Sequence, residues 1–197
     1  EDIILGTSVA GRPWAELKNS VGFFANTVAL RHNVDGYGTV RDLLRLAKSV
    51  ILSGLEHADL PFARVVEAVS PERSMSYPPV IQATVSLLSR GEMNPAQGLD
   101  LDGLEAAPFG GEEQEAKFEL DLILAETTKG LLGRLSYAKQ LFDRETAERL
   151  AGMYARVLEA VVADPGTLVC DLPVLDDTER RLVVEGFNAT AAEYPRG

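Results

Sequence analysis

The chain has 197 residues, of which 46% are apolar and 25% are charged, and its formal net charge is −11. This length suits one domain or one large lobe with a tail, and the apolar share is ample for a core and unlike that of a disordered chain. The acidic balance argues against a nucleic-acid-binding protein, which usually carries a basic patch. No apolar run approaches the ~18 residues of a membrane span.

A single cysteine, Cys170, allows no intrachain disulfide, so we expect a reducing, cytoplasmic setting. With only two histidines in the chain, Cys170 has little choice of base and is not expected to be a nucleophile. The chain begins Glu1-Asp2-Ile3, without an initiating Met or a basic leader. That start favours a fragment that carries no signal peptide.

Two strands are predicted first. Ile3-Ile4-Leu5 opens a short strand that ends at Gly6-Thr7, and a second strand runs from Val28 to His32. A helix then begins at Thr39, because Thr39 and Asp42 have the spacing of a capping box. The helix face expected to be buried consists of Val40, Leu43, Leu44, Ala47, Val50, Ile51 and Gly54.

A basic stripe formed by Arg41, Arg45 and Lys48 lies on another side of this helix. A solvated face is the simpler interpretation, and contact with an acidic partner or a phosphate is the alternative. A second, short helix starts at about Pro61, since proline suits a first helical turn.

Strand patterns dominate the next segment. Residues 80–88 alternate, with Ile81, Ala83, Val85 and Leu87 on one predicted face, and residues 99–106 form a weak edge strand. Residues 118–124 form a half-buried strand, and residues 131–137 return as its hairpin partner after a turn at 127–130, with Gly133 as a candidate bulge.

The last long helix is capped by Asp143 and ends at Asp164-Pro165-Gly166. Its apolar stripe consists of Ala147, Leu150, Ala151, Tyr154, Val157, Leu158 and Val161. A further helix is expected over residues 177–186. The mixture predicts an α+β fold, with helices packed on one face of a mainly antiparallel or mixed sheet.

The negative charge is concentrated between Asp100 and Glu126, where nine acidic residues stand against one lysine and give −8 of the net −11. A solvated loop with an exposed strand face is the simpler interpretation. A docking role for this segment is the weaker alternative.

Two polar pairs stand out. Asn26 and Thr27 interrupt the apolar run 21–31, so their side chains must bind neighbouring backbone or face a cavity. His57 and Asp59 have the spacing of a catalytic dyad. The same spacing fits a helix junction, in which His57 lies near the negative end of its helix and Asp59 caps the next one.

Several of these stretches resemble motifs of condensation domains from non-ribosomal peptide synthetases. Residues 21–31 resemble (I/V)GxFxNTxxxR, and residues 57–62 resemble (H/N)QDxPFE with Ala58 for Gln and, next to them, Ala63 for Glu. Residues 71–80 resemble RDxSRxPL, with Tyr77 and Val80 departing from it. Residues 6–12 are similar to GTPVAGR and residues 117–120 to KFDL. The singled-out matching positions are Arg12, Gly22, Asn26, Thr27, Arg31, His57, Asp59, Pro61, Phe62, Arg73 and Ser76.

The resemblance implies a chloramphenicol-acetyltransferase-like fold of two lobes around a cleft, with the catalytic histidine in an HHxxxDG motif of the N-terminal lobe. This chain has only His32 and His57, and neither is followed by Asp-Gly at that distance. We therefore expect residues 1–170 to be a C-terminal lobe without a catalytic residue of its own. Residues 171–197 resemble, through Asn188-Ala189-Thr190-Ala191, a linker that leads into an adenylation domain.

The resemblance also implies the chemistry of the complete domain, which joins two acyl chains carried on the 4'-phosphopantetheine arms of donor and acceptor carrier proteins. The implied partners are these carriers, the N-terminal lobe and the downstream adenylation domain, with no directly bound cofactor or metal. Asn26 is the candidate to face the reaction centre, where its amide could orient a substrate; a structural staple is the alternative. Arg12 and Arg31 are expected to be scaffold, and residues 99–124 the bridge that latches the lobes together.

Two other functions share this fold. The first is a condensation-like interaction module that recruits a partner protein without catalysing condensation. The second is an epimerization domain lobe, against which the adenylation-type tail argues, because epimerization domains usually close a module.

Overall fold

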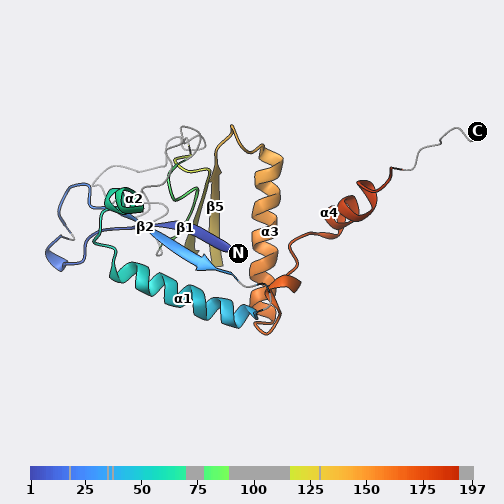
Figure 1. Cartoon of the computed structure of the whole chain (residues 1–197), viewed down its shortest axis with the longest axis horizontal. Helices are drawn as coiled ribbons and strands as arrows, with labels where there is room; N and C mark the ends of the chain where they lie inside the picture. Colours follow the sequence, from blue (N-terminus) through green and yellow to red (C-terminus); the bar gives the residue numbers. More distant parts are fainter. Residues whose placement is uncertain are drawn as a thin grey trace, which may run out of the picture.

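The computed structural model describes residues 1–17, 19–34, 36, 38–69, 78–88, 116–128 and 130–190. Its centre is a five-stranded sheet with the order β2-β1-β3-β4-β5 (Figure 1). The strands are β1 (Asp2–Val9), β2 (Asn26–Asn33), β3 (Ala83–Leu88), β4 (Leu120–Thr127) and β5 (Gly130–Tyr137). The β1–β2 and β4–β5 pairs are antiparallel, whereas β3 runs parallel to both β1 and β4. The sheet is therefore mixed, and the predicted α+β class is confirmed.

The helices are α1 (Val40–Glu56), α2 (Phe62–Val69), α3 (Arg144–Ala163) and α4 (Asp177–Arg181). Short turns of other helical types are η1 (Ala15–Leu17), η2 (Val169–Asp171) and η3 (Leu182–Gly186), the last being a π-helix. Helices α1 and α2 pack beside β2, and α3 lies beside β5 at the other edge of the sheet (Figure 1). The predicted helices all form, and that over residues 177–186 is divided between α4 and η3.

Strands β1 and β2 are longer than predicted, because they pair residue by residue from Asp2–Asn33 to Val9–Asn26. Asn26 and Thr27 thus open β2 rather than precede it. Local propensity disfavours asparagine in strands, but cross-strand pairing overrides it.

Two predicted helix caps are confirmed. At α1, the Asp42 N–H donates to Thr39 Oγ1 at 3.2 Å and the Thr39 N–H donates to Asp42 Oδ2 at 3.3 Å, which completes the capping box. At α3, the Thr146 N–H donates to Asp143 Oδ1 at 2.7 Å. Hydrogen bonds from Thr39 and from Thr146 lower the pKa of Asp42 and of Asp143, respectively, below the usual value for a carboxyl group.

The buried core is small and includes Val28, Leu30, Val40, Ile81, Ala125 and Ala147. Helix α1 approaches β2 closely at Gly54, where an added Cβ would lie 2.5 Å from Leu30 Cδ2. The predicted buried face of α1 is wrong at Leu44 and Ile51, whose side chains are 51% and 40% exposed. Because α1 contacts the sheet through an edge strand, only its narrow Val40-to-Gly54 side is covered.

The predicted faces of β3 are also partly wrong. Thr84 is only 6% exposed, whereas Leu87 is 64% exposed. Thr84 can be buried because its hydroxyl donates to Asp121 Oδ1 on β4 at 2.5 Å, so the polar group keeps a partner. Gly133 forms no bulge, since β4 and β5 pair in unbroken register from Leu120–Tyr137 to Thr127–Gly130.

A tight turn delays the start of β3 to Ala83. The Ile81 N–H donates to the Pro79 carbonyl at 2.8 Å, and Val80 between them has a φ of +68°. This is the geometry of a classic γ-turn, which is rare and strained for a β-branched residue. The turn places Ile81 against Gly6, where an added Cβ would lie 2.8 Å from Ile81 Cγ2.

Candidate functional site: the Asn26 junction

The Asn26 side chain holds together the connection between α1 and α2. Its Nδ2 donates to the carbonyls of Ala58 and Leu60, both at 2.8 Å, and its Oδ1 accepts the Phe62 N–H at 3.1 Å. Both amide hydrogens and the amide oxygen are therefore bound to backbone 32 to 36 residues away. The sequence predicted that the polar side chain of Asn26, inside an apolar run, needs a hydrogen-bond partner. The backbone of the α1–α2 connection is that partner.

This contact joins the two most distinctive sequence motifs, residues 21–31 and residues 57–62. Helix α2 begins at Phe62, one residue after the predicted start at about Pro61. Asp59 does not cap α2, because the N–H of Phe62 at the helix start donates to Asn26 instead. A distant asparagine thus performs the capping role that local spacing assigned to an aspartate.

His57 is the C-cap residue of α1, and its ring Nδ1 lies 2.9 Å from the Ser53 carbonyl oxygen. Among the residues that the structure describes, no hydrogen bond joins His57 to Asp59. The geometry therefore agrees with a helix junction and brings together no His–Asp dyad.

Arg12 braces the loop before β2. Its Nε donates to the Leu17 carbonyl at 3.1 Å and its Nη2 to the Ser20 carbonyl at 2.9 Å, while its guanidinium carbon lies 4.5 Å from the centroid of the Phe24 ring. Gly22 leaves room for that ring, because an added Cβ would lie 3.0 Å from Phe24 Cε2. These contacts hold in place the loop that leads into Asn26.

Arg31 pairs with Asp2 across the β1–β2 ladder. The guanidinium donates through Nε and Nη2, with a shortest distance of 2.6 Å to Asp2 Oδ2. The hydrogen bonds with the partner lower the pKa of Asp2 and raise that of Arg31. Both side chains are well exposed, so the pair contributes little to stability.

A groove of about 500 Å³ lies between the edge strand β2 and the helices α1 and α2. Thr27, Ala29 and Arg31 line it from β2, Ser53 and His57 from α1, and Val65 from α2. Thr27 and His57, predicted from separate motifs, therefore face one hollow.

Arg73, Ser76 and most of the predicted inter-lobe bridge over residues 99–124 lie outside the described residues. Cys170 is exposed. In the described part of the chain, no helix is long and apolar enough to cross a membrane, and no group of three or more potential metal ligands occurs.

Sequence reasoning missed Arg156 of α3. Its guanidinium reaches the segment after α3, donating to the Val174 carbonyl at 2.8 Å and to Glu179 Oε2 at 3.0 Å. The only available signal was a charged residue within an otherwise apolar part of the helix, next to Val157.

The chain resembles much larger synthetases along almost its entire length. It is 36% identical over 196 residues to tyrocidine synthase 3 of Brevibacillus parabrevis, covering 100% of this chain and 3% of that protein. It is 38% identical over 191 residues to malpinin synthetase of Mortierella alpina, covering 97% of this chain and 2% of that protein. The chain thus spans only 2% to 3% of the length of these relatives.

Solved structures with the same fold include holo-AB3403, a four-domain nonribosomal peptide synthetase bound to AMP and glycine, with a TM-score of 0.80 and 29% identity over 91% of this chain and 14% of that one. The X-domain from teicoplanin biosynthesis, in complex with OxyB, matches with a TM-score of 0.78 and 26% identity over 89% and 38%. The family model described as "Condensation domain" matches residues 1–184. The chain belongs to the condensation domain family.

Proposed function

We propose that this chain is the C-terminal lobe of a condensation domain that forms amide bonds between carrier-bound aminoacyl or peptidyl thioesters. The observation that carries the proposal is the family match over residues 1–184, in which the two hallmark stretches meet at Asn26. The similarity of this chain to the synthetases of two organisms supports the same proposed role in peptide synthesis.

The reaction joins an acceptor amine to a donor acyl group. The amine nitrogen attacks the thioester carbonyl carbon, the C–N bond forms, the C–S bond breaks, and the amine proton ends on the departing sulfur. The substrates arrive on phosphopantetheine arms, so the lobe itself holds no cofactor. The imidazole that handles the proton is proposed to belong to the N-terminal lobe, because this chain contains no HHxxxDG sequence.

Within this scheme the Asn26 junction acts as support for the reaction tunnel. All three hydrogen-bonding positions of its amide are used by backbone, which favours the structural-staple interpretation over direct contact with substrate. Asn26 would then be a positioning residue, and Thr27 and His57 would present polar groups to the groove beside it.

The proposed partners are the N-terminal lobe, the donor and acceptor carrier proteins and a downstream adenylation domain, all in a cytoplasmic setting. The proposed division of the chain places the lobe at residues 1–170 and the linker at 171–197. The similarity to a four-domain synthetase supports a multidomain context.

The test measures amide product by mass spectrometry with loaded donor and acceptor carriers. The chain of residues 1–197 is compared with a longer polypeptide that includes the ~200–250 residues before Glu1, a size in keeping with an ordinary lobe. We expect product only from the longer polypeptide, and none after its HHxxxDG histidine is replaced by alanine. Turnover by residues 1–197 alone would contradict the proposal.

A non-catalytic interaction module is the second candidate, because the teicoplanin X-domain that matches this fold was solved in complex with another protein, OxyB. A longer polypeptide that lacks HHxxxDG, binds a partner protein and forms no amide would favour this candidate. An intact HHxxxDG with amide formation would exclude it.

A further inference from the structure

Arg156 connects the lobe to the segment that leaves it. From the side of α3, its Nη2 atom donates to both the Val174 carbonyl and Glu179 Oε2, while Nη1 lies 3.8 Å from Asp176 Oδ2. The side chains of Arg156 and Glu179 are only 27% and 15% exposed. Hydrogen bonds between charged groups are stronger than neutral ones, and partial burial reduces screening by salt.

The two acidic partners of Arg156 are also the two members of the α4 capping box. Asp176 Oδ1 accepts the N–H groups of Thr178 and Glu179, both at 2.8 Å, and Glu179 Oε2 accepts the Asp176 N–H at 3.1 Å. Arg156 therefore binds a carboxylate arrangement that exists only while α4 is helical. Docking on α3 and folding of α4 are coupled through one guanidinium.

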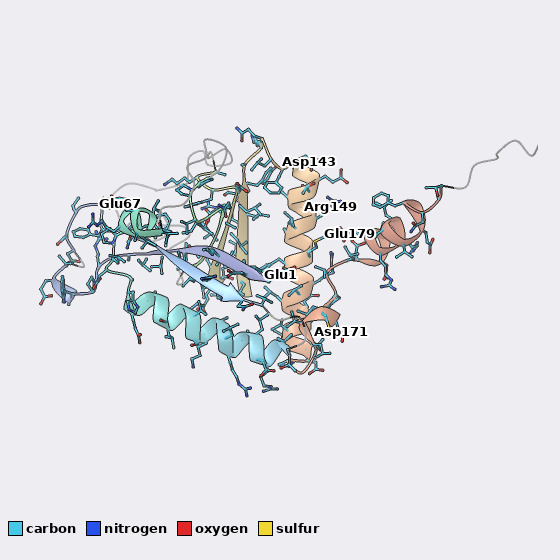
Figure 2. The ribbon with its side chains drawn as sticks, viewed as in Figure 1. Glu1, Glu67, Asp143, Arg149, Asp171 and Glu179 are labelled. Atoms are coloured by element: carbon cyan, nitrogen blue, oxygen red, sulfur yellow. The ribbon has the colours of Figure 1, made fainter. Side chains whose placement is uncertain are left out.

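The segment has little else to keep it helical. Helix α4 and η3 together span residues 177–186, of which only Glu179 is not exposed. Isolated helices shorter than ~12–15 residues are marginal in water. Figure 1 shows α4 set apart from the sheet, beyond α3, and Figure 2 shows Glu179 on the side of α4 toward α3.

Beyond the anchored turn, the segment displays apolar side chains to solvent. Leu182, Val183, Val184 and Phe187 are 45–67% exposed. Little apolar burial therefore holds this part of the segment in place.

We infer that Arg156 is a positioning residue that holds residues 174–187 folded against α3.

The anchor is tested by hydrogen–deuterium exchange of residues 177–187 in the chain 1–197. We expect Arg156→Gln to speed exchange there on the order of ten-fold, the factor expected when a charge-assisted hydrogen bond is lost. Arg156→Lys, which keeps the charge but loses the planar fork, should have an intermediate effect. The matched control is Arg149→Gln on the same helix, where the arginine donates a hydrogen bond to Thr146 of α3 itself.

Raising the salt concentration from about 0.05 to about 1 M should speed exchange in the wild type and leave Arg156→Gln unchanged, because screening acts on the ion pair. Exchange that is equal in the wild type, Arg156→Gln and Arg149→Gln would overturn the anchor.

The exchange experiment does not use amide formation, so its outcome is independent of the proposed function.

Discussion

The Asn26 junction and the Arg156 anchor share one arrangement but differ in charge and exposure. In each, one side chain reaches across from a regular element and binds the start of a later helix: Asn26 binds the N–H of Phe62 at α2, and Arg156 binds Glu179 at α4. The Asn26 contacts are neutral, and two of the three are partly buried. The Arg156 contacts are ionic and hold a segment that is almost wholly exposed.

Because of this difference, we expect the Asn26 junction to persist while the sheet is folded and the Arg156 anchor to open more easily. A neutral amide bound to three backbone groups is insensitive to salt, and breaking it leaves polar groups without partners. A partly exposed ion pair, by contrast, responds to ionic strength. We expect the α1–α2 connection to unfold together with the sheet, and residues 174–187 to open independently of the sheet.

Replacing Asn26 should have the largest effect. Asn26→Ala removes three hydrogen bonds to backbone, so we expect the free energy of unfolding to fall by about 3 kcal/mol, at ~1 kcal/mol for each bond. The measurement is urea denaturation followed by circular dichroism. The control is Asn33→Ala at the exposed opposite end of β2, for which a change within ~0.5 kcal/mol is expected. Similar losses of unfolding free energy in both variants would contradict the stabilising role of the Asn26 junction.

The Asp143 cap tests α3, the helix that carries the anchor. Asp143→Ala should destabilise α3, because it removes the N-cap hydrogen bond to the Thr146 N–H. The Thr146 hydrogen bonds lower the pKa of Asp143 in the folded state. Its contribution is therefore present above the unfolded pKa of about 3.9 and lost as pH falls through the lower folded value.

Thermal unfolding at several pH values checks this prediction. The stability difference between wild type and Asp143→Ala should be constant near neutral pH and shrink below about pH 4. Glu145→Gln, which leaves the cap in place, is the control. A difference that persists unchanged at the lowest pH would show that the carboxylate charge is not involved.

The γ-turn at Val80 should show the smallest effect. Val80→Gly relieves a left-handed conformation that costs about 1–2 kcal/mol, offset by about 0.5–1 kcal/mol of added chain entropy in the unfolded state and by the loss of the Val80 side-chain contacts, so we expect a net gain below ~1 kcal/mol. Val80→Ala keeps the positive φ and loses side-chain contacts, so it should lower the free energy of unfolding. Destabilisation by glycine greater than by alanine, measured by the same urea titration, would show that the turn stores no strain.

Local patterns in the sequence predicted the helices and their ends well. Thr39, Asp42 and Asp143 satisfy backbone groups within a few residues of themselves, so their roles are readable without the fold. The family motifs likewise identified Asn26 and residues 57–62 as special, and the match to the condensation domain family confirmed the resemblance. The predicted roles of Arg73 and Ser76, and of the bridge over residues 99–124, stay predictions.

The sequence alone determined the α+β class, the caps and the family, because these depend on periodicity, short-range hydrogen bonding and motif order. Only the tertiary structure decided which apolar faces are covered, that Asn26 caps a helix 36 residues away, and that Arg156 binds the next capping box. Those outcomes depend on strand register and on how helices sit at the edges of the sheet. Leu44 is exposed and Thr84 buried for the same reason: burial is set by the neighbours a residue acquires in space, and a local pattern cannot specify them.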